Sequence, residues 1–193
     1  FRIDSENRVI KGSEEELILN NIGKNVDEWH QLAGTRGPES YFVNMAWDTE
    51  PPTTTKMFTT VNLCKVNEGA HISKVVNSVK KYLTGFIGKN NQDGTMKYNF
   101  QPSDCLVGFR LYINLKIIKA AYAEQTKKRL SSQSNLGVMD DFETKMETYF
   151  KSNPKKLYEL LDSFQSYRAS LTSKKLSGVV NTGQKRSMSV LTR

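Results

Sequence analysis

Clustered basic side chains are the residues of this sequence best suited to chemistry. Lys127, Lys128 and Arg129 follow one another shortly after a long alternating apolar segment. Adjacent cations can bind an anion such as a phosphate group, but a basic loop can equally serve only to keep a surface solvated. Charge by itself does not decide between these two interpretations.

The histidines and the paired carboxylates are weaker candidates. His30 and His71 are far apart in the sequence and match no metal-ligand spacing, so both are predicted to be structural or surface residues. Asp140 and Asp141 stand at a predicted helix start, where carboxylates interact favourably with the helix dipole. The sequence has no Walker loop and no glycine-rich dinucleotide fingerprint. It therefore predicts no self-contained active site.

Composition restricts the class of protein. The chain has 193 residues and a formal net charge of +8, which suits one domain with a polyanionic partner. No apolar run reaches the ~20 residues that a membrane span needs. Cys64 and Cys105 lie in apolar segments and are predicted to be buried thiols of an intracellular protein. Because the chain begins with a strand-like segment at Phe1, we expect it to be a piece of a longer polypeptide.

Alternation of apolar and polar residues predicts three strands, over residues 40–48, 56–64 and 106–118. In the last strand one side is apolar and the other side is polar. The apolar side consists of Val107, Phe109, Leu111, Ile113, Leu115 and Ile117, and the polar side of Arg110, Asn114 and Lys116. Residues 1–12 predict a short hairpin. Residues 24–38 have a weak period and predict a loop or a short helix.

Helical periodicity is clearest over residues 68–88, and further helices are predicted over residues 13–23 and 140–171. Pro154 is expected to begin a second half of the last helix, because proline is accepted at a helix start but not in its interior. The order of elements predicts an α+β fold of two layers, in which helices cover one face of a mixed sheet. The helix that links two strands of this sheet predicts a crossover, which is expected to be right-handed.

The loop after the third strand carries a family resemblance. Residues 108–117 lead into Ala121–Leu130, where Tyr122 is followed by Gln125, Thr126 and Lys127. This segment resembles the strand and "QTK loop" of the transducer domain in the ATPase region of type II DNA topoisomerases, which has the pattern P-x-F-x-x-Q-T-K-x-x-L. Tyr122 stands in the place of the family's aromatic residue.

A second resemblance to the same family lies upstream. Residues 58–63 precede Glu68-Gly69-Ala70-His71 and a long helix, in a pattern similar to the family's strand and its G-G-T-H motif. Glu68 and Ala70 replace the family's first Gly and its Thr, so no role of that Thr can be carried over. The two motifs occur in the expected order, and the resemblance covers residues 40–171. The divergence resembles a phage or viral member of the gyrase B and topoisomerase II family.

The resemblance implies a fold of the ribosomal protein S5 domain 2-like type and a division of the chain. Residues 1–12 would end a preceding GHKL ATPase domain, residues 13–171 would form the transducer, and residues 172–193 would lead toward a TOPRIM and DNA-cleavage domain. ATP and Mg²⁺ would be bound mainly by the upstream domain, which lies outside this chain. The piece alone is therefore expected to neither hydrolyse ATP nor cleave DNA.

The resemblance also assigns roles to residues. Lys127 would be the catalytic residue that contacts the γ-phosphate, and Gln125 and Thr126 would complete the ATP-binding loop. The implied partners are double-stranded DNA, the remaining domains of the same polypeptide and a second copy of the enzyme, in the cytoplasm or nucleoid, or in the host cytoplasm for a phage or viral enzyme. Residues implied to line the path of DNA are Lys151, Lys155, Lys156, Lys174 and Lys175.

Two other functions fit the same observations. The chain could be the second domain of another GHKL ATPase, of the mismatch-repair or chaperone type, although these lack the Q-T-K spelling. It could also be a non-catalytic basic module that binds nucleic acid through phosphate contacts alone, with binding that depends steeply on salt.

Overall fold

The computed structural model describes residues 29–48, 55–92, 98 and 101–170, together with two short strands at the start of the chain. These strands, Arg2–Ile3 (β1) and Val9–Ile10 (β2), pair in antiparallel fashion. The predicted N-terminal hairpin is thus confirmed. The helix predicted over residues 13–23 lies outside the described residues, as do residues 172–193.

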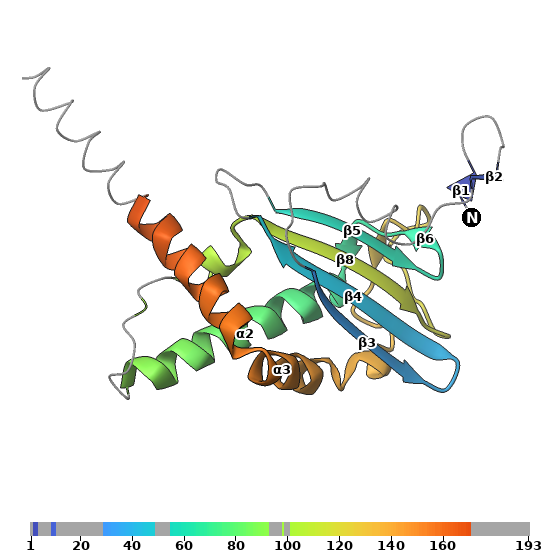
Figure 1. The fold of residues 1–193 in the computed structure, drawn as a ribbon. Helices are drawn as coiled ribbons and strands as arrows, with labels where there is room; N and C mark the ends of the chain where they lie inside the picture. Colours follow the sequence, from blue (N-terminus) through green and yellow to red (C-terminus); the bar gives the residue numbers. More distant parts are fainter. Residues whose placement is uncertain are drawn as a thin grey trace, which may run out of the picture.

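The centre of the fold is a mixed sheet of five strands in the order β3-β4-β8-β5-β6 (Figure 1). β5 and β8 are parallel, and the other neighbours in the sheet are antiparallel. The predicted mixed sheet is confirmed. Its strands are β3 (His30–Arg36), β4 (Glu39–Trp47), β5 (Lys56–Val61), β6 (Cys64–Lys65) and β8 (Phe109–Lys116).

Helices cover one face of this sheet (Figure 1). They are α2 (Ala70–Gln92), α3 (Phe142–Ser152) and a helix over residues 154–170, with single 3₁₀ turns at Asp104–Leu106 (η1) and Gly137–Met139 (η2). Asn153 separates α3 from the helix that Pro154 begins, as the sequence predicted. The buried stripe of α2, with Val75, Val79 and Leu83, shares one hydrophobic core with the apolar sides of β4 and β8.

One strand was not predicted, because its buried positions carry no strong apolar pattern. β3 occupies part of residues 24–38, and its buried residues are His30, Leu32 and Gly34. A Cβ atom on Gly34 would lie 2.3 Å from the ring of Tyr41 in β4, so the tyrosine ring fills the space above the glycine. A side chain of the neighbouring strand thus fills part of the core face of β3. The apolar pattern of residues 30–36 alone cannot show this.

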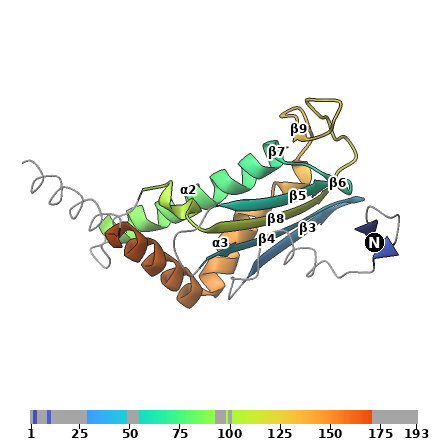
Figure 2. The same cartoon turned by 90° about the horizontal axis from the view of Figure 1, so that it is seen from above.

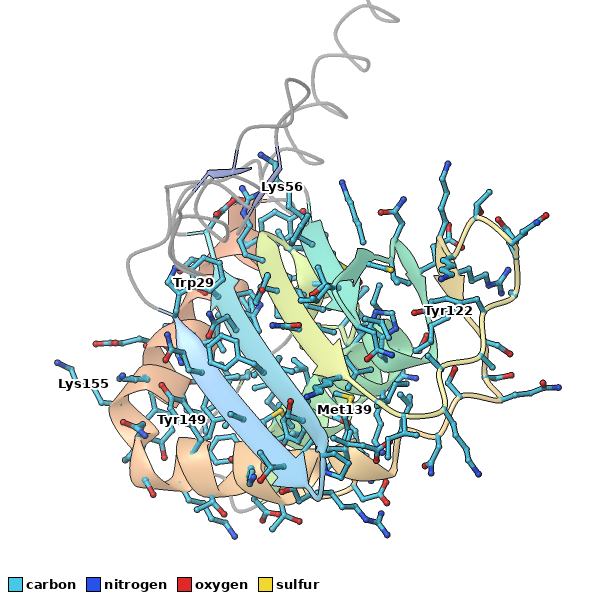
Figure 3. All side chains as sticks on the ribbon, turned by 90° about the vertical axis from the view of Figure 1, so that its right-hand side faces the viewer. Trp29, Lys56, Tyr122, Met139, Tyr149 and Lys155 are labelled. Carbon is cyan, nitrogen blue, oxygen red and sulfur yellow. The ribbon has the colours of Figure 1, made fainter. Side chains whose placement is uncertain are left out.

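The crossover from β5 through α2 to β8 is present, but its hand is opposite to the expected one. In Figure 3 the sheet is seen along its strands, with α2 below it and β8 to the left of β5. Both strands run toward the viewer, so the connection is left-handed (Figures 1 and 3). A right-handed connection is the usual one, because a right-twisted strand followed by a right-handed helix normally packs back onto the sheet that way. Here β6 occupies one side of β5, and β8 lies between β5 and β4.

The second face of the sheet is less polar than the alternation predicted. Tyr112 is buried there among Trp29, Phe42 and Phe58. Arg110, predicted to lie on the polar side, is also buried, and its guanidinium forms a two-pronged ion pair with the carboxylate of Asp48. Lys116 is exposed, as predicted.

The expectations drawn from composition have mixed outcomes. Cys105 is buried, and burial raises the pKa of its thiol to about 12, whereas Cys64 is only half-buried. Among the described residues, no helix has the length and apolar character needed to cross a membrane.

Candidate functional site

The loop that follows β8 projects from the end of the sheet and is closed at its base (Figure 2). The amide of Ala123 donates to the carbonyl of Arg129 at 3.0 Å, and the amide of Ser131 donates to the carbonyl of Ala121 at 2.8 Å. The Ser134 hydroxyl also donates to the Ala121 carbonyl, at 2.8 Å. These bonds define residues 123–129 as a closed loop, called the 123–129 loop below.

The tip of the 123–129 loop presents the Q-T-K residues to solvent. Gln125, Thr126 and Lys127 are all exposed. A turn holds them, because the Lys127 amide donates to the Glu124 carbonyl at 3.1 Å and Lys127 takes a φ of 56°. The Lys127 ammonium lies 5.9 Å from the centre of the Tyr122 ring, a cation–π distance. Figure 3 shows Tyr122 beside the loop, at the end of the sheet that faces the viewer.

The cations of this loop are available to an external anion. In the described part of the chain, no ion pair within 4.0 Å is recorded for Lys127, Lys128 or Arg129. Thr126 is engaged locally, since its hydroxyl donates to the Glu124 carboxylate at 3.1 Å. An exposed ammonium on a turn of defined backbone geometry is chemically suited to contact a phosphate.

The two sequence motifs meet in space. Arg129–Leu130 (β9) pairs in parallel with Glu68–Gly69 (β7), the segment directly before α2. The amide of Asn67 adds a hydrogen bond of 2.8 Å to the carbonyl of Lys128. This pairing also explains why α2 begins at Ala70 and not at residue 68, since residues 68 and 69 are extended.

Gly69 is required at this contact. Its φ of 138° is in a region that residues with a side chain rarely adopt, and a Cβ atom there would lie 2.4 Å from the carbonyl oxygen of Leu130. The glycine therefore permits the close approach of the two backbones. Of the G-G-T-H pattern, this chain retains the glycine and the histidine that the local structure uses.

His71 is a buried structural histidine. Its side chain is fully buried, and its Nε2 lies 2.9 Å from the Thr59 hydroxyl of β5. That hydroxyl donates its single proton to the Val66 carbonyl, so it must accept from His71. His71 is then the neutral tautomer with the proton on Nε2. Its Nδ1 atom has no hydrogen-bond partner among the described residues, and burial lowers the pKa of His71 to about 4.

The buried state of His71 predicts a loss of stability in mild acid. The pKa of 6.5 expected in the unfolded chain falls to about 4 in the folded one, so only the unfolded chain takes up a proton in between. The contribution of His71 to the free energy of unfolding is complete above pH 6.5 and is lost as the pH falls to 4. The loss is roughly 3 kcal/mol. Urea unfolding at a series of pH values measures it. A His71→Gln variant keeps the Nε2 donor without titrating, so parallel curves for the two proteins would contradict the prediction.

The family assignment follows from the whole described region. The family model for DNA gyrase B matches residues 14–178 of the chain. The chain belongs to the DNA gyrase B family. The match includes the main sheet, α2, α3 and both motifs, so it covers the fold and the 123–129 loop together. A comparison with curated protein sequences gives no match.

Solved structures of gyrase and topoisomerase fragments share this fold. The topoisomerase IV ATP-binding domain of Francisella tularensis, solved with a small-molecule inhibitor, aligns with 72% of this chain and 39% of its own, at 17% identity and a TM-score of 0.58. The 43K ATPase domain of Thermus thermophilus gyrase B, solved with an aminocoumarin, aligns with 81% of this chain and 44% of its own, at 15% identity and a TM-score of 0.57. This chain thus spans about two fifths of those structures.

Within the gyrase B family, the chain is a type II topoisomerase transducer domain. The predicted two-layer α+β fold is confirmed, and so is the resemblance to the gyrase B and topoisomerase II family. The matching family is DNA gyrase B, which favours the topoisomerase prediction over the mismatch-repair and chaperone alternatives. The proposed limits at residues 12 and 172 stay predictions, as do the roles of Gln125, Thr126 and Lys127.

The other titratable candidates have structural partners in this chain. His30 is buried, and its Nδ1 lies 2.9 Å from the hydroxyl of Tyr149. Asp140 accepts from the Lys74 ammonium at 2.8 Å, and Asp141 accepts from the Tyr41 hydroxyl at 2.8 Å. These contacts tie the start of α3 to α2 and β4. Among the described residues, no group of His, Cys, Asp and Glu could hold a metal ion.

The lysines predicted to contact DNA are only partly available. Lys151 is ion-paired with Glu147 at 2.7 Å, and Lys155 lies 3.7 Å from Glu159. Lys156 lies over the ring of Tyr149 at 5.9 Å. Lys174 and Lys175 lie outside the described residues. DNA binding by this surface therefore stays a prediction.

The support behind the loop was missed at the sequence level. The 123–129 loop is connected to β5 through Thr59, Val66 and Tyr122. In the sequence, Thr59 was noted only as part of a predicted strand. The available signal was weak: the first of two adjacent Thr residues in a predicted strand, and a Gly-x-His spacing after it. Neither indicates a hydrogen bond, because the bonded atoms are brought together only when β5 and α2 pack.

Proposed function

We propose that this domain couples ATP binding and hydrolysis to DNA strand passage in a type II DNA topoisomerase, through contact of Lys127 with the γ-phosphate. The observation that carries the proposal is the placement of Lys127. It is an exposed cation without a recorded ion-pair partner in the described region, at the tip of a loop closed at its base.

The residues present fit a phosphate ligand. ATP, bound with Mg²⁺ mainly by a domain outside this chain, supplies the anionic phosphate on which charge develops during hydrolysis. A cation held in place before the reaction stabilises such charge at little cost in reorganisation. Lys127 provides the cation and Gln125 provides an exposed amide beside it, whereas the hydroxyl of Thr126 is occupied by Glu124. We therefore assign the main contact to Lys127 and a supporting one to Gln125.

The 123–129 loop is connected on both sides to the main fold, so a change at its tip can affect the sheet and α2. Its returning strand is paired with β7, which leads directly into the 23 residues of α2. Its other side reaches β5, because the Tyr122 hydroxyl lies 3.4 Å from the Val61 carbonyl. Loss of the γ-phosphate would remove the contact with Lys127, and the loop connects that event to the sheet and to a long helix.

The test is a Lys127→Ala variant of the intact enzyme. Removal of one preorganised charge contact of this kind typically costs about 100-fold or more in kcat, so we expect a loss of ATP turnover of this size and a matching loss of strand passage. Lys128→Ala removes the adjacent exposed cation and serves as the matched control, with turnover close to that of the wild type. Unchanged turnover in Lys127→Ala, or an equal loss in both variants, would contradict the proposed contact.

The remaining roles follow from the same proposal. The DNA segment, the ATPase and TOPRIM domains and a second copy of the enzyme would be the partners of this domain, and the isolated piece would be inactive. The non-catalytic nucleic-acid-binding function has less support, because Lys151 and Lys155 each have a glutamate four residues away in the sequence within ion-pair distance, which lowers the net positive charge of this surface.

A further inference from the structure

Both sides of the 123–129 loop are attached to the same short part of β5. The returning side is attached through residues 66–71, and the outgoing side through the Tyr122 hydroxyl, which lies 3.4 Å from the Val61 carbonyl. Thr59, two residues before Val61 in β5, is hydrogen-bonded to Val66 and His71 at the two ends of residues 66–71. The position of the loop therefore depends on how this part of β5 is hydrogen-bonded.

The Thr59 hydroxyl forms hydrogen bonds with both ends of the segment of residues 66–71. It donates to the carbonyl of Val66, and it accepts from Nε2 of His71 at 2.9 Å. All three residues are almost fully buried, with exposed fractions of 2% for Thr59 and 0% for Val66 and His71. Because water cannot replace these partners at a buried site, loss of the hydroxyl leaves a carbonyl and an imidazole N–H unsatisfied.

The residues between those two ends hold the chain directly after Lys127. The amides of Asn67 and Glu68 both point to the carbonyl of Lys128, at 2.8 and 3.3 Å. Gly69 is in register with Leu130 in the pairing of β7 with β9. Three consecutive residues thus fix the three residues that follow Lys127.

We infer that Thr59 and His71 are positioning residues that hold the 123–129 loop, and with it the ammonium of Lys127, in its working place. The functional part of this inference rests on the function proposed above for Lys127. Both side chains are buried, so neither is exposed to contact a nucleotide directly. They act through residues 66–71. Without the Thr59 hydroxyl, this segment would lose a hydrogen bond at each of its two ends.

The first test measures the loop in this chain, without nucleotide. Thr59→Val replaces the hydroxyl by a methyl group of similar size, and Thr59→Ser keeps the hydroxyl. We expect hydrogen exchange of the Asn67, Ala123 and Lys127 amides to become at least tenfold faster in Thr59→Val than in Thr59→Ser. The amides of β4 and β8 should change only with overall stability. Equal exchange at the loop in the two variants would overturn the inference.

A second pair of variants tests the same inference if Thr59→Val does not fold. His71→Met removes the Nε2 donor but leaves the bond from Thr59 to Val66, and His71→Gln keeps a donor at a similar position. We expect faster exchange at the same three amides in His71→Met only. An unchanged loop in His71→Met would contradict a positioning role for His71.

The intact enzyme separates this inference from the proposed function. We expect Thr59→Val to lower kcat for ATP hydrolysis about tenfold, and Thr59→Ser to restore it. In a Lys127→Ala background, Thr59→Val should cause no further loss, because its effect passes through Lys127. A full additional loss there would indicate general damage and overturn the positioning role. A loosened loop in Thr59→Val together with a harmless Lys127→Ala would leave the support intact and refute the proposed γ-phosphate contact.

Discussion

Replacing Gly69 by alanine is expected to destabilise the folded chain by about 3 kcal/mol or more and to release the 123–129 loop. Two costs add. A φ of 138° strains any residue with a side chain, by about 1–3 kcal/mol. The new Cβ would also lie 2.4 Å from the carbonyl oxygen of Leu130, and a backbone atom cannot move aside as the end of a flexible side chain can. The pairing of β7 with β9 must therefore open.

Urea unfolding of Gly69→Ala and Gly37→Ala separates the two costs. Gly37 also has a positive φ, of 61°, but a Cβ atom there would meet nothing within 4 Å. Gly37→Ala should cost only about 1 kcal/mol, the usual penalty of the left-handed region. If both variants lose the same free energy of unfolding, the close approach of Gly69 to Leu130 is not a significant constraint.

The same substitution has a functional consequence. Opening of the pair between β7 and β9 frees the chain directly after Lys127, so Gly69→Ala should lower ATP turnover in the intact enzyme as well as stability. Gly37, which is in the turn between β3 and β4, should affect stability alone. The comparison relates a backbone contact to the proposed contact of Lys127 with the nucleotide.

Replacing Asp48 by alanine is expected to cost about 3–5 kcal/mol of folding stability. The Arg110 guanidinium contacts both carboxylate oxygens of Asp48, and the two side chains are only 9% and 4% exposed. Without Asp48, the buried guanidinium of Arg110 would lose the one ion-pair partner recorded for it in the described part of the chain. Chemical denaturation of the single variant measures this loss.

Two controls determine whether the loss comes from the uncompensated charge. The double variant Asp48→Ala/Arg110→Met removes both charges and should recover most of the stability, because buried ion pairs can often be replaced by apolar side chains at little cost. Glu159→Ala breaks the pair with Lys155, in which both side chains are more than half exposed, and should cost less than about 1 kcal/mol. A double variant as unstable as Asp48→Ala would contradict this explanation.

Local patterns in the sequence determined the elements with strong periodicity. The apolar stripe of α2 and the alternation of β8 both survive in the structure, because one buried face at a regular spacing is enough to specify a helix or a strand. Pro154 determined a helix start for the same local reason, since it lacks an amide that a helix interior would need. The consecutive residues Gln125, Thr126 and Lys127 indicated the protein family with which the loop could be compared.

Tertiary structure alone decided the features that depend on partners distant in sequence. In β3, the ring of Tyr41 from the neighbouring strand fills the space above Gly34. The burial of Arg110 depends on Asp48, which is 62 residues away in the sequence but adjacent in space. The hand of the crossover depends on which side of β5 holds β8 and on which face of the sheet α2 covers, and no single segment of the sequence indicates either.

The loop itself combines both kinds of information. Its residues could be recognised from the sequence, because Gln125, Thr126 and Lys127 are consecutive. Its support could not, because Thr59, Gly69 and Leu130 are apart in the sequence and meet only when β5, α2 and β9 pack together. The sequence determined which side chains are presented, and the packed structure decided where they are held, since hydrogen bonds between distant segments form only after the chain has folded.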